Sequence, residues 1–159
     1  MNDNDLRKLL KSLKTIVMIG VSTSPIRASF FVARYFILRG VRIIPINPKY
    51  VGQKFWEEEF LKSIKDIDSK TNVDMVDIFR PSNEVYPIVK ESIKYLKPLG
   101  CKTIWMQIGI ENQRAAKEAK KHDLNVIMNK CPKIEYQRLF GELRVAGFNT
   151  GIISSKIDL

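Results

Sequence analysis

The stretch TIVMIGVSTSPIRASFFVARYFILRG, from Thr15 to Gly40, decides the fold. Residues 15–20 are almost entirely apolar and predict a short buried strand. Small and polar residues then break the pattern, and the apolar spacing of 29–39 predicts an amphipathic helix that stops at Gly40. A strand, a short loop and a helix make a turn that often binds phosphate. The glycine-rich motif G-x-G-x-x-G is missing, because Gly20 is the only glycine of this loop.

The same alternation of strands and helices continues along the chain. Further strands are predicted at 41–48, 73–81, 101–109 and 124–129, and helices at 82–96, begun by the capping residue Ser82, and at 113–121, begun by Asn112. The N-terminal residues 1–14 have a helical pattern, and 52–68 predict a loop with a weak helix. Apolar strands separated by helices indicate a parallel sheet covered on both faces. We therefore expect an α/β protein of three layers, a doubly wound parallel sheet of about five strands.

The length of the chain predicts a single domain over residues 1–159, since no linker or repeat interrupts it. No apolar run is long enough to cross a bilayer, and the N-terminal stretch lacks the apolar core of a signal peptide. We expect a cytoplasmic protein that does not enter a membrane. Cys101 and Cys131 are too far apart for a chelating pair and His122 is the only histidine, which argues against a metal site and, in a reducing compartment, against a disulfide.

The net charge of +10 fits either a lysine-rich soluble surface or an anionic partner. Residues 1–48 hold eight Lys or Arg and only two acids, which favours an anionic partner near the predicted phosphate turn. Nucleic acid is not the expected partner, because no basic run is interleaved with aromatic residues and no nucleic-acid motif is present.

Ligands of doubly wound sheets bind beyond the carboxyl ends of the strands. In the first such loop, Gly20 permits a tight turn, the hydroxyls of Ser22, Thr23 and Ser24 are available, and Ser29 is expected to cap the helix. The unpaired N–H groups at the helix start would suit a pyrophosphate. The alternative is a plain turn with a capping serine and no ligand.

The end of the second strand argues against NAD. An NAD site usually has Asp or Glu there, whereas this chain has Asn47-Pro48-Lys49. A lysine favours a ribose with an extra phosphate, as in NADP or coenzyme A. The alternative is that Asn47-Pro48 is only a turn that stops a strand.

Three other segments allow two interpretations each. Phe79-Arg80-Pro81 could flank an adenine, or Phe79 could be a core residue followed by a solvated Arg80. Cys131 could be a nucleophile, but no histidine lies near it in sequence, and a buried inert thiol is the default. Trp56 and Phe60 either cover the sheet edge or contribute to a homo-oligomer surface.

Taken together, these segments resemble the small stand-alone CoA-binding proteins, whose domain is also the N-terminal module of the succinyl-CoA synthetase alpha subunit. The resemblance covers about residues 13–156 and rests on these stretches: IGVSTSPIRASFFVARYF, RIIPINPK, VDMVDIFRPSNEV, IWMQIGIENQRAAKEA, VIMNKCPKIEYQRL and GFNTGIISSK. It implies a Rossmann-like CoA-binding fold.

The resemblance also implies roles for individual residues. By this resemblance the pyrophosphate would be held by Gly20, Val21 and Ser22 with Arg27 and Ser29. The adenosine and its 3′-phosphate would be bordered by Asn47, Pro48 and Lys49, and the adenine side would be lined by Phe79, Arg80 and Pro81. The pantetheine path would be faced by Gln107 and Gly109, and the segment that closes the last strand would be formed by Asn129, Cys131 and Pro132.

The chain also departs from the family pattern. The synthetase carries its phosphorylated histidine in a later domain, which this chain does not contain, and His122 does not match it. Ser, Thr and Pro replace the family's glycine-richer loop. We therefore expect a protein that binds coenzyme A or an acyl-CoA without catalysis of its own. An enzyme using NADP or another nucleotide on the same turn is the alternative, and a nucleic-acid-binding module is a weaker one.

Overall fold

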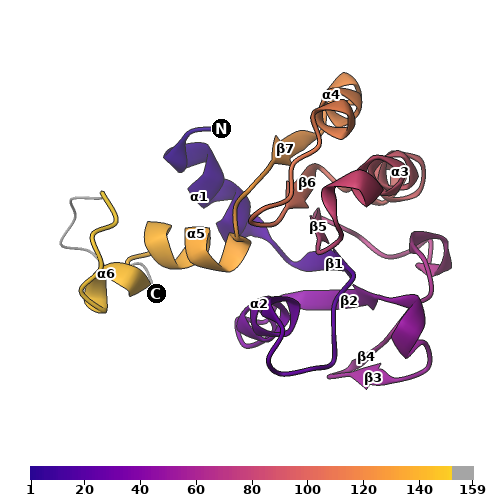
Figure 1. Cartoon of the computed structure of the whole chain (residues 1–159), viewed down its shortest axis with the longest axis horizontal. Coiled ribbons are helices and arrows are strands. Elements are labelled where there is room, and N and C mark those ends of the chain that lie inside the picture. The colour runs from indigo at the N-terminus through magenta and orange to yellow at the C-terminus, as the bar shows by residue number, and fades with distance from the viewer. Residues whose placement is uncertain (152–159) are drawn as a thin grey trace.

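Five parallel strands form the central sheet of the protein, whose computed structural model we describe for residues 1–151. The strands are β1 Thr15–Ile19, β2 Arg42–Ile46, β5 Met75–Ile78, β6 Thr103–Met106 and β7 Asn125–Ile127, and they pair in the order β2-β1-β5-β6-β7 (Figure 1). The chain adds β2 on one side of β1 and then returns to add β5 on the other side. This reversal of direction makes the sheet doubly wound, as the sequence predicts.

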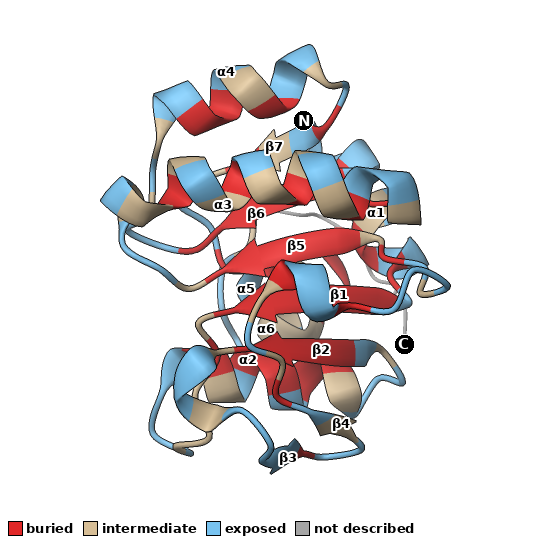
Figure 2. Ribbon diagram, turned by 90° about the vertical axis from the view of Figure 1, so that its right-hand side faces the viewer, coloured by how far each residue is buried: buried red, intermediate tan, exposed pale blue. Residues whose placement is uncertain are grey.

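Helices cover both faces of this sheet (Figure 2). The helices α1 Asp3–Ser12, α2 Ala28–Ile37 and α5 Pro132–Leu139 pack on one face, and α3 Val85–Glu91 and α4 Gln113–Lys121 pack on the other. A short helix, α6 Glu142–Val145, follows α5. The three-layer, Rossmann-like α/β architecture is confirmed. None of the helices within residues 1–151 is both long and apolar enough to span a bilayer.

The predicted elements agree with the structure best where a local signal marks a boundary. Helix α4 has the predicted range, and the side chain of Asn112 caps it by accepting a hydrogen bond from the Ala115 N–H at 2.9 Å. Helix α3 is shorter than predicted, with a 3₁₀ turn before it and a π-helical turn, Ser92–Leu96, after it. The prediction that Ser82 caps this helix is wrong, because its hydroxyl accepts from the Glu111 N–H instead.

The weak helix predicted over 52–68 is wrong. This segment contains a hairpin of two short antiparallel strands, β3 Lys54–Phe55 and β4 Glu58–Glu59. The hairpin brings Phe55 and Phe60 together, with ring centroids 5.2 Å apart, and buries both against the core. Burial of these two rings outweighs the weak helical pattern. Phe60 thus packs inside the molecule, while Trp56 is partly exposed at the turn between the strands.

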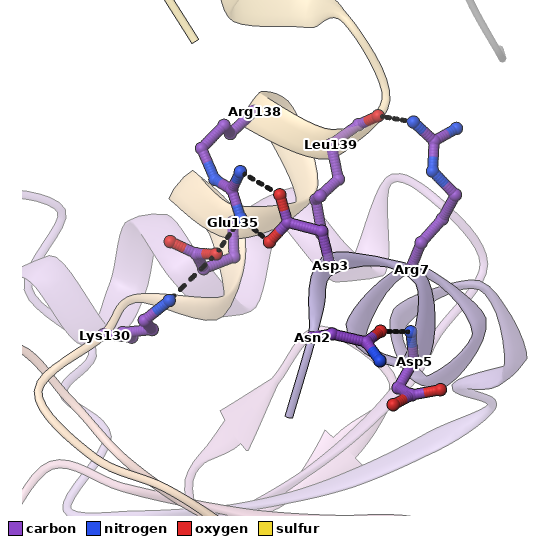
Figure 3. A network of polar contacts seen from close by, with 8 residues as sticks. All are labelled: Asn2, Asp3, Asp5, Arg7, Lys130, Glu135, Arg138 and Leu139. Atoms are coloured by element: carbon purple, nitrogen blue, oxygen red, sulfur yellow. Dashed lines mark hydrogen bonds and ion pairs between the residues drawn. The ribbon is translucent and has the colours of Figure 1, made fainter. Parts of the chain in front are cut away.

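A network of charged side chains joins the first helix, α1, to α5 (Figure 3). The guanidinium of Arg138 on α5 donates two hydrogen bonds to Asp3 on α1 and one to Glu135. Glu135 is almost completely buried and has Lys130 as a second partner at 3.5 Å. The network raises the pKa of Arg138 and lowers that of Asp3, because each hydrogen bond favours the charged form. These contacts help fix α1 against α5.

We expect Arg138→Leu to lower the free energy of unfolding by about 1–3 kcal/mol, because it leaves the buried Glu135 carboxylate short of a cation. The matched variant Asp3→Asn should cost less than about 1 kcal/mol, since Asp3 is exposed and its ion pair is screened by water. Urea unfolding of the three proteins measures both values. Equal losses for the two variants would contradict this account of the network.

Candidate functional site

The turn after β1 meets the loop after β5 at the point where the strand order reverses. Gly20 has a φ of +84°, and a Cβ atom there would lie 2.7 Å from the carbonyl oxygen of Phe79 and 2.8 Å from Cδ of Arg80. Only glycine fits this backbone conformation and this close approach. The single glycine of the loop therefore brings two of the predicted segments into direct contact.

Hydrogen bonds within the turn hold it in a defined shape. The Ser22 N–H donates to Oγ of Ser29, and the Ser24 N–H donates to Oγ of Ser22, both at 3.1 Å. The prediction that Ser29 caps the helix is therefore wrong. The N-cap residue of α2 is Arg27, which makes no capping bond with its side chain, and Ser29 is a buried residue of the first helical turn that ties the loop to the helix.

The second strand end is bonded to the same turn. The side-chain amide of Asn47 donates to the carbonyl oxygen of Val21 at 2.9 Å. The hydroxyl of Tyr50, a residue that the sequence analysis did not single out, lies 3.3 Å from Oγ of Ser22. This hydrogen bond lowers the pKa of Tyr50. The loops after β1 and β2 thus form one unit.

The start of α2 offers donors to an anion. Among residues 1–151, the backbone N–H groups of Thr23, Ala28 and Ser29 have no hydrogen-bond partner. Arg27 is exposed beside them. Free N–H groups at the positive end of a helix, next to a guanidinium, form a favourable environment for phosphate.

A cavity of about 470 Å³ opens on one side of Gly20, and Asn47 and Pro48 line it. Most of its surface is apolar, but we call it the polar cavity because its wall carries five charged residues: Lys49, Lys62, Arg80, Glu84 and Glu91. Lys62 was missed because the loop that carries it follows the hairpin rather than a strand of the main sheet. Arg80 already forms an ion pair with Glu84 at 2.6 Å, so its charge is partly compensated.

A second, mainly apolar cavity of about 490 Å³ lies beyond Arg80, which lines both cavities. Its wall includes Phe79, Pro81, Gln107 and Cys131 from the predicted site, together with Phe31, Ile108, Ile110 and Ile134. Phe79 and Pro81 come from the loop after β5, and the other apolar residues come from α2, α5 and the loop after β6. A cavity of this size and lining is typical of a small-molecule site.

Other residues of the predicted site shape the backbone around the cavities. The side chain of Asn129 accepts a hydrogen bond from the Gly109 N–H at 2.8 Å, and its own φ is +55°, a conformation that asparagine tolerates. Pro132 is the first residue of α5, where a missing N–H costs nothing. Neither these three residues nor Thr23 and Ser24 line the two cavities.

The candidate nucleophiles are the two cysteines, and neither thiol has a lowered pKa. Burial raises the pKa of Cys131, and Cys101 is likewise buried, with a pKa raised to about 11. Both thiols are free. His122 ends α4, with its ring nitrogen 3.6 Å from Glu118. Within residues 1–151 no three His, Cys, Asp or Glu side chains are grouped to hold a metal ion.

Two larger hollows, of about 740 and 780 Å³, lie at the opposite edge of the sheet, where the strands begin. Asp74 lines both, and its carboxylate accepts the backbone N–H groups of Lys14 and Thr15 at 2.8 Å. Ligands of doubly wound sheets bind beyond the carboxyl ends of the strands rather than at the ends where the strands begin. The edge with Gly20 is therefore the better candidate.

One buried carboxyl lies next to the apolar cavity. Asp77 on β5 is completely buried, and its two oxygens accept hydrogen bonds from Nε2 of Gln107 at 2.8 and 2.9 Å. Burial raises the pKa of Asp77 to about 8, although the hydrogen bonds from Gln107 and from the backbone of Ile78 act in the opposite direction. The sequence analysis did not single out Asp77, because an acid within an apolar strand run carries no motif.

The raised pKa predicts how stability depends on pH. The folded state holds the Asp77 proton up to about pH 8, whereas the unfolded chain releases it near 4. Ionising Asp77 therefore destabilises the folded state. Its contribution to the free energy of unfolding falls as pH rises from about 4 to about 8, by up to about 1.4 kcal/mol per pH unit.

We expect Asp77→Asn to remove this decline. The free energy of unfolding of the variant, relative to that of the wild type, should therefore increase as pH rises from about 5 to 8. Urea unfolding at several pH values measures the difference, with the exposed Glu57→Gln as the control. A difference between Asp77→Asn and wild type that stays constant over this range would contradict the assignment.

Comparison with known proteins gives a family for this chain. A family model described as "CoA binding domain" matches residues 14–137. The uncharacterized protein YneT of Bacillus subtilis is 29% identical over 135 residues, which is 83% of this chain and 92% of YneT. A solved structure from Thermus thermophilus, cell-free ID.343, has 31% identity and a TM-score of 0.80 over 88% of this chain and 100% of that one. A hypothetical protein from Pyrococcus horikoshii OT3 has 30% identity and a TM-score of 0.79 over 89% and 94%. The chain belongs to the CoA-binding domain family.

Proposed function

We propose that the protein binds coenzyme A or an acyl-CoA at the carboxyl edge of its sheet. The observation that carries the proposal is the arrangement around Gly20, where a tight phosphate-type turn lies between a polar cavity and an apolar one. Coenzyme A has matching parts: a phosphorylated adenosine, a pyrophosphate and a long pantetheine arm. Membership of the CoA-binding domain family supports the same ligand.

In this proposal the pyrophosphate binds at the start of α2. The free N–H groups of Thr23, Ala28 and Ser29 would donate to its oxygens, and Arg27 would add a charge. The hydrogen bonds from Ser22 to Ser29 and from Asn47 to Val21 keep the loop in shape before the ligand arrives. A preformed loop lowers the entropic cost of binding.

The phosphorylated adenosine would occupy the polar cavity. Lys49 and Lys62 are both exposed at its wall, and neither has a salt-bridge partner among residues 1–151. They are better placed to neutralise a 3′-phosphate than Arg80, whose guanidinium is paired with Glu84. Phe79 and Pro81 lie on the other side of Arg80, at the apolar cavity, where the arm would run.

The proposed activity is binding without a covalent step. The thiol of Cys131 lines the apolar cavity, and burial raises its pKa, which keeps it protonated. A nucleophile of this kind normally needs an adjacent base. The one histidine of the chain ends α4, and the two cavities are lined by other residues.

We expect Lys49→Met to weaken binding of coenzyme A about three- to tenfold, because an exposed charge-assisted contact to the 3′-phosphate is lost. Binding of 3′-dephospho-coenzyme A should be unchanged by the same substitution. Lys54→Met, which removes an exposed lysine outside both cavities, is the matched control. Isothermal titration calorimetry measures all six affinities.

Equal wild-type affinity for the two forms of the cofactor would show that the 3′-phosphate is not recognised. Absence of binding of either form would overturn the proposed function. Tighter binding of NADP than of coenzyme A would favour a nicotinamide nucleotide as the ligand.

A further inference from the structure

The amide of Gln107 has a fixed orientation in the wall of the apolar cavity. Gln107 follows β6 directly, the residue is 6% exposed, and it lines the cavity. Its Nε2 lies within 2.9 Å of both carboxyl oxygens of Asp77. Because the nitrogen and the oxygen of an amide point in different directions from the same carbon, Oε1 is turned away from Asp77.

This oxygen reaches the surface of the cavity. Among residues 1–151, every buried polar side-chain atom has a hydrogen-bond partner. None of the hydrogen bonds of Gln107 involves Oε1. The oxygen is therefore accessible rather than enclosed, and the accessible space next to Gln107 is the apolar cavity. The mainly apolar wall, to which Arg80 and Lys133 also contribute, thus presents one amide oxygen as an acceptor.

The position of Asp77 is costly and needs an explanation. The register of the sheet places Asp77 between Met18 of β1 and Trp105 of β6, both completely buried. A carboxyl in such surroundings destabilises the fold unless it is paired. No cation contacts it within the described residues, and its side-chain partner is Gln107 alone. An apolar residue here would serve the core better, so the carboxyl has a use other than stability.

We propose that Asp77 is a positioning residue, which holds the amide of Gln107 with its oxygen toward the apolar cavity, so that the site selects a ligand arm carrying a hydrogen-bond donor. The ionised carboxylate only accepts hydrogen bonds, so it pairs with Nε2 of Gln107 and not with Oε1. The neutral acid also has an O–H donor that Oε1 could accept, so it is the ionised form that fixes the nitrogen of Gln107 inward. Without Asp77 the amide is free to turn its nitrogen to the cavity and present a donor instead.

This inference rests on the proposed function and makes it more specific. The pantetheine arm of coenzyme A has amide N–H groups and a terminal thiol, and each is a donor that Oε1 of Gln107 could accept. A purely hydrocarbon arm would leave this oxygen desolvated and unpaired, which is unfavourable. The cavity is thereby suited to a polar arm with apolar segments rather than to a plain acyl chain.

The test compares coenzyme A with 3′-phosphoadenosine 5′-diphosphate, which keeps both phosphates of the pyrophosphate and lacks the arm, by calorimetry at one pH above about 8, where Asp77 is ionised. The dissociation constant of the arm-free nucleotide divided by that of coenzyme A measures what the arm contributes. We expect Asp77→Val and Gln107→Met each to lower this ratio about five- to tenfold, and the double variant to lower it no further than Gln107→Met does. Asp77→Asn keeps one acceptor for Nε2 but adds a donor for Oε1, so its ratio should lie between those of Asp77→Val and wild type. Affinity for the arm-free nucleotide should stay the same in all variants.

A merely structural role of Asp77 would change both ligands together, or act independently of Gln107, and either result would overturn the inference. An unchanged ratio in Gln107→Met would overturn it as well. If wild type binds both ligands with equal affinity, the arm is not recognised and the inference fails while nucleotide binding stands. If neither ligand binds, the proposed function itself fails. Acetyl-CoA identifies the donor: a Gln107→Met effect that persists with acetyl-CoA assigns an amide N–H, and one limited to free coenzyme A assigns the thiol.

Discussion

The contact between the backbone of Gly20 and the Phe79 carbonyl is the constraint on which the site depends. A side chain at position 20 would meet this oxygen at 2.7 Å, so the turn after β1 and the loop after β5 can touch only because the residue is glycine. The contact lies where the strand order reverses, and this reversal separates the first two loops from the later ones. The polar cavity and the apolar cavity lie on either side of it and share Arg80.

Polar side chains around this contact hold the loops of the site in place. Ser29, Asn47 and Asn129 each use a side chain to hold a loop: Ser29 and Asn47 hold the turn after Gly20, and Asn129 holds the loop after β6. Asp77 does the same for Gln107 at a larger cost, because its carboxyl is completely buried. In each case a side chain holds by hydrogen bonding a group that would otherwise be free to move, which favours a preformed site.

Much of the fold could be predicted from the sequence because its signals are local. The apolar runs predict the five strands, and Asn112 marks the start of α4 with its own side chain. The hairpin at 54–59 could not be predicted in this way, since it depends on contact between Phe55 and Phe60 in the folded core. Ser29 looks like a helix cap, yet its hydroxyl is used by Ser22, a partner that only the folded loop brings close.

The site could be predicted in outline from the residues that follow the strands, and the resemblance supplied the ligand. The structure groups the Gly20 turn with Asn47, Pro48, Lys49 and the loop at Arg80. The sequence could not reveal Lys62, which reaches the cavity from outside the sheet, or Glu84, which pairs with Arg80. Nor could it reveal the pairing of Asp77 with Gln107, because the two residues lie 30 positions apart in the chain.

The most direct test of the central claim is a map of backbone amide shifts when coenzyme A is added to ¹⁵N-labelled protein. The account predicts that the largest changes fall at 20–29, 47–50, 79–84 and 107–110, around the Gly20 contact. Residues 14, 74, 102 and 125, at the opposite edge of the sheet, should change little. The largest changes at that opposite edge, or no changes at all at saturating ligand, would contradict the account.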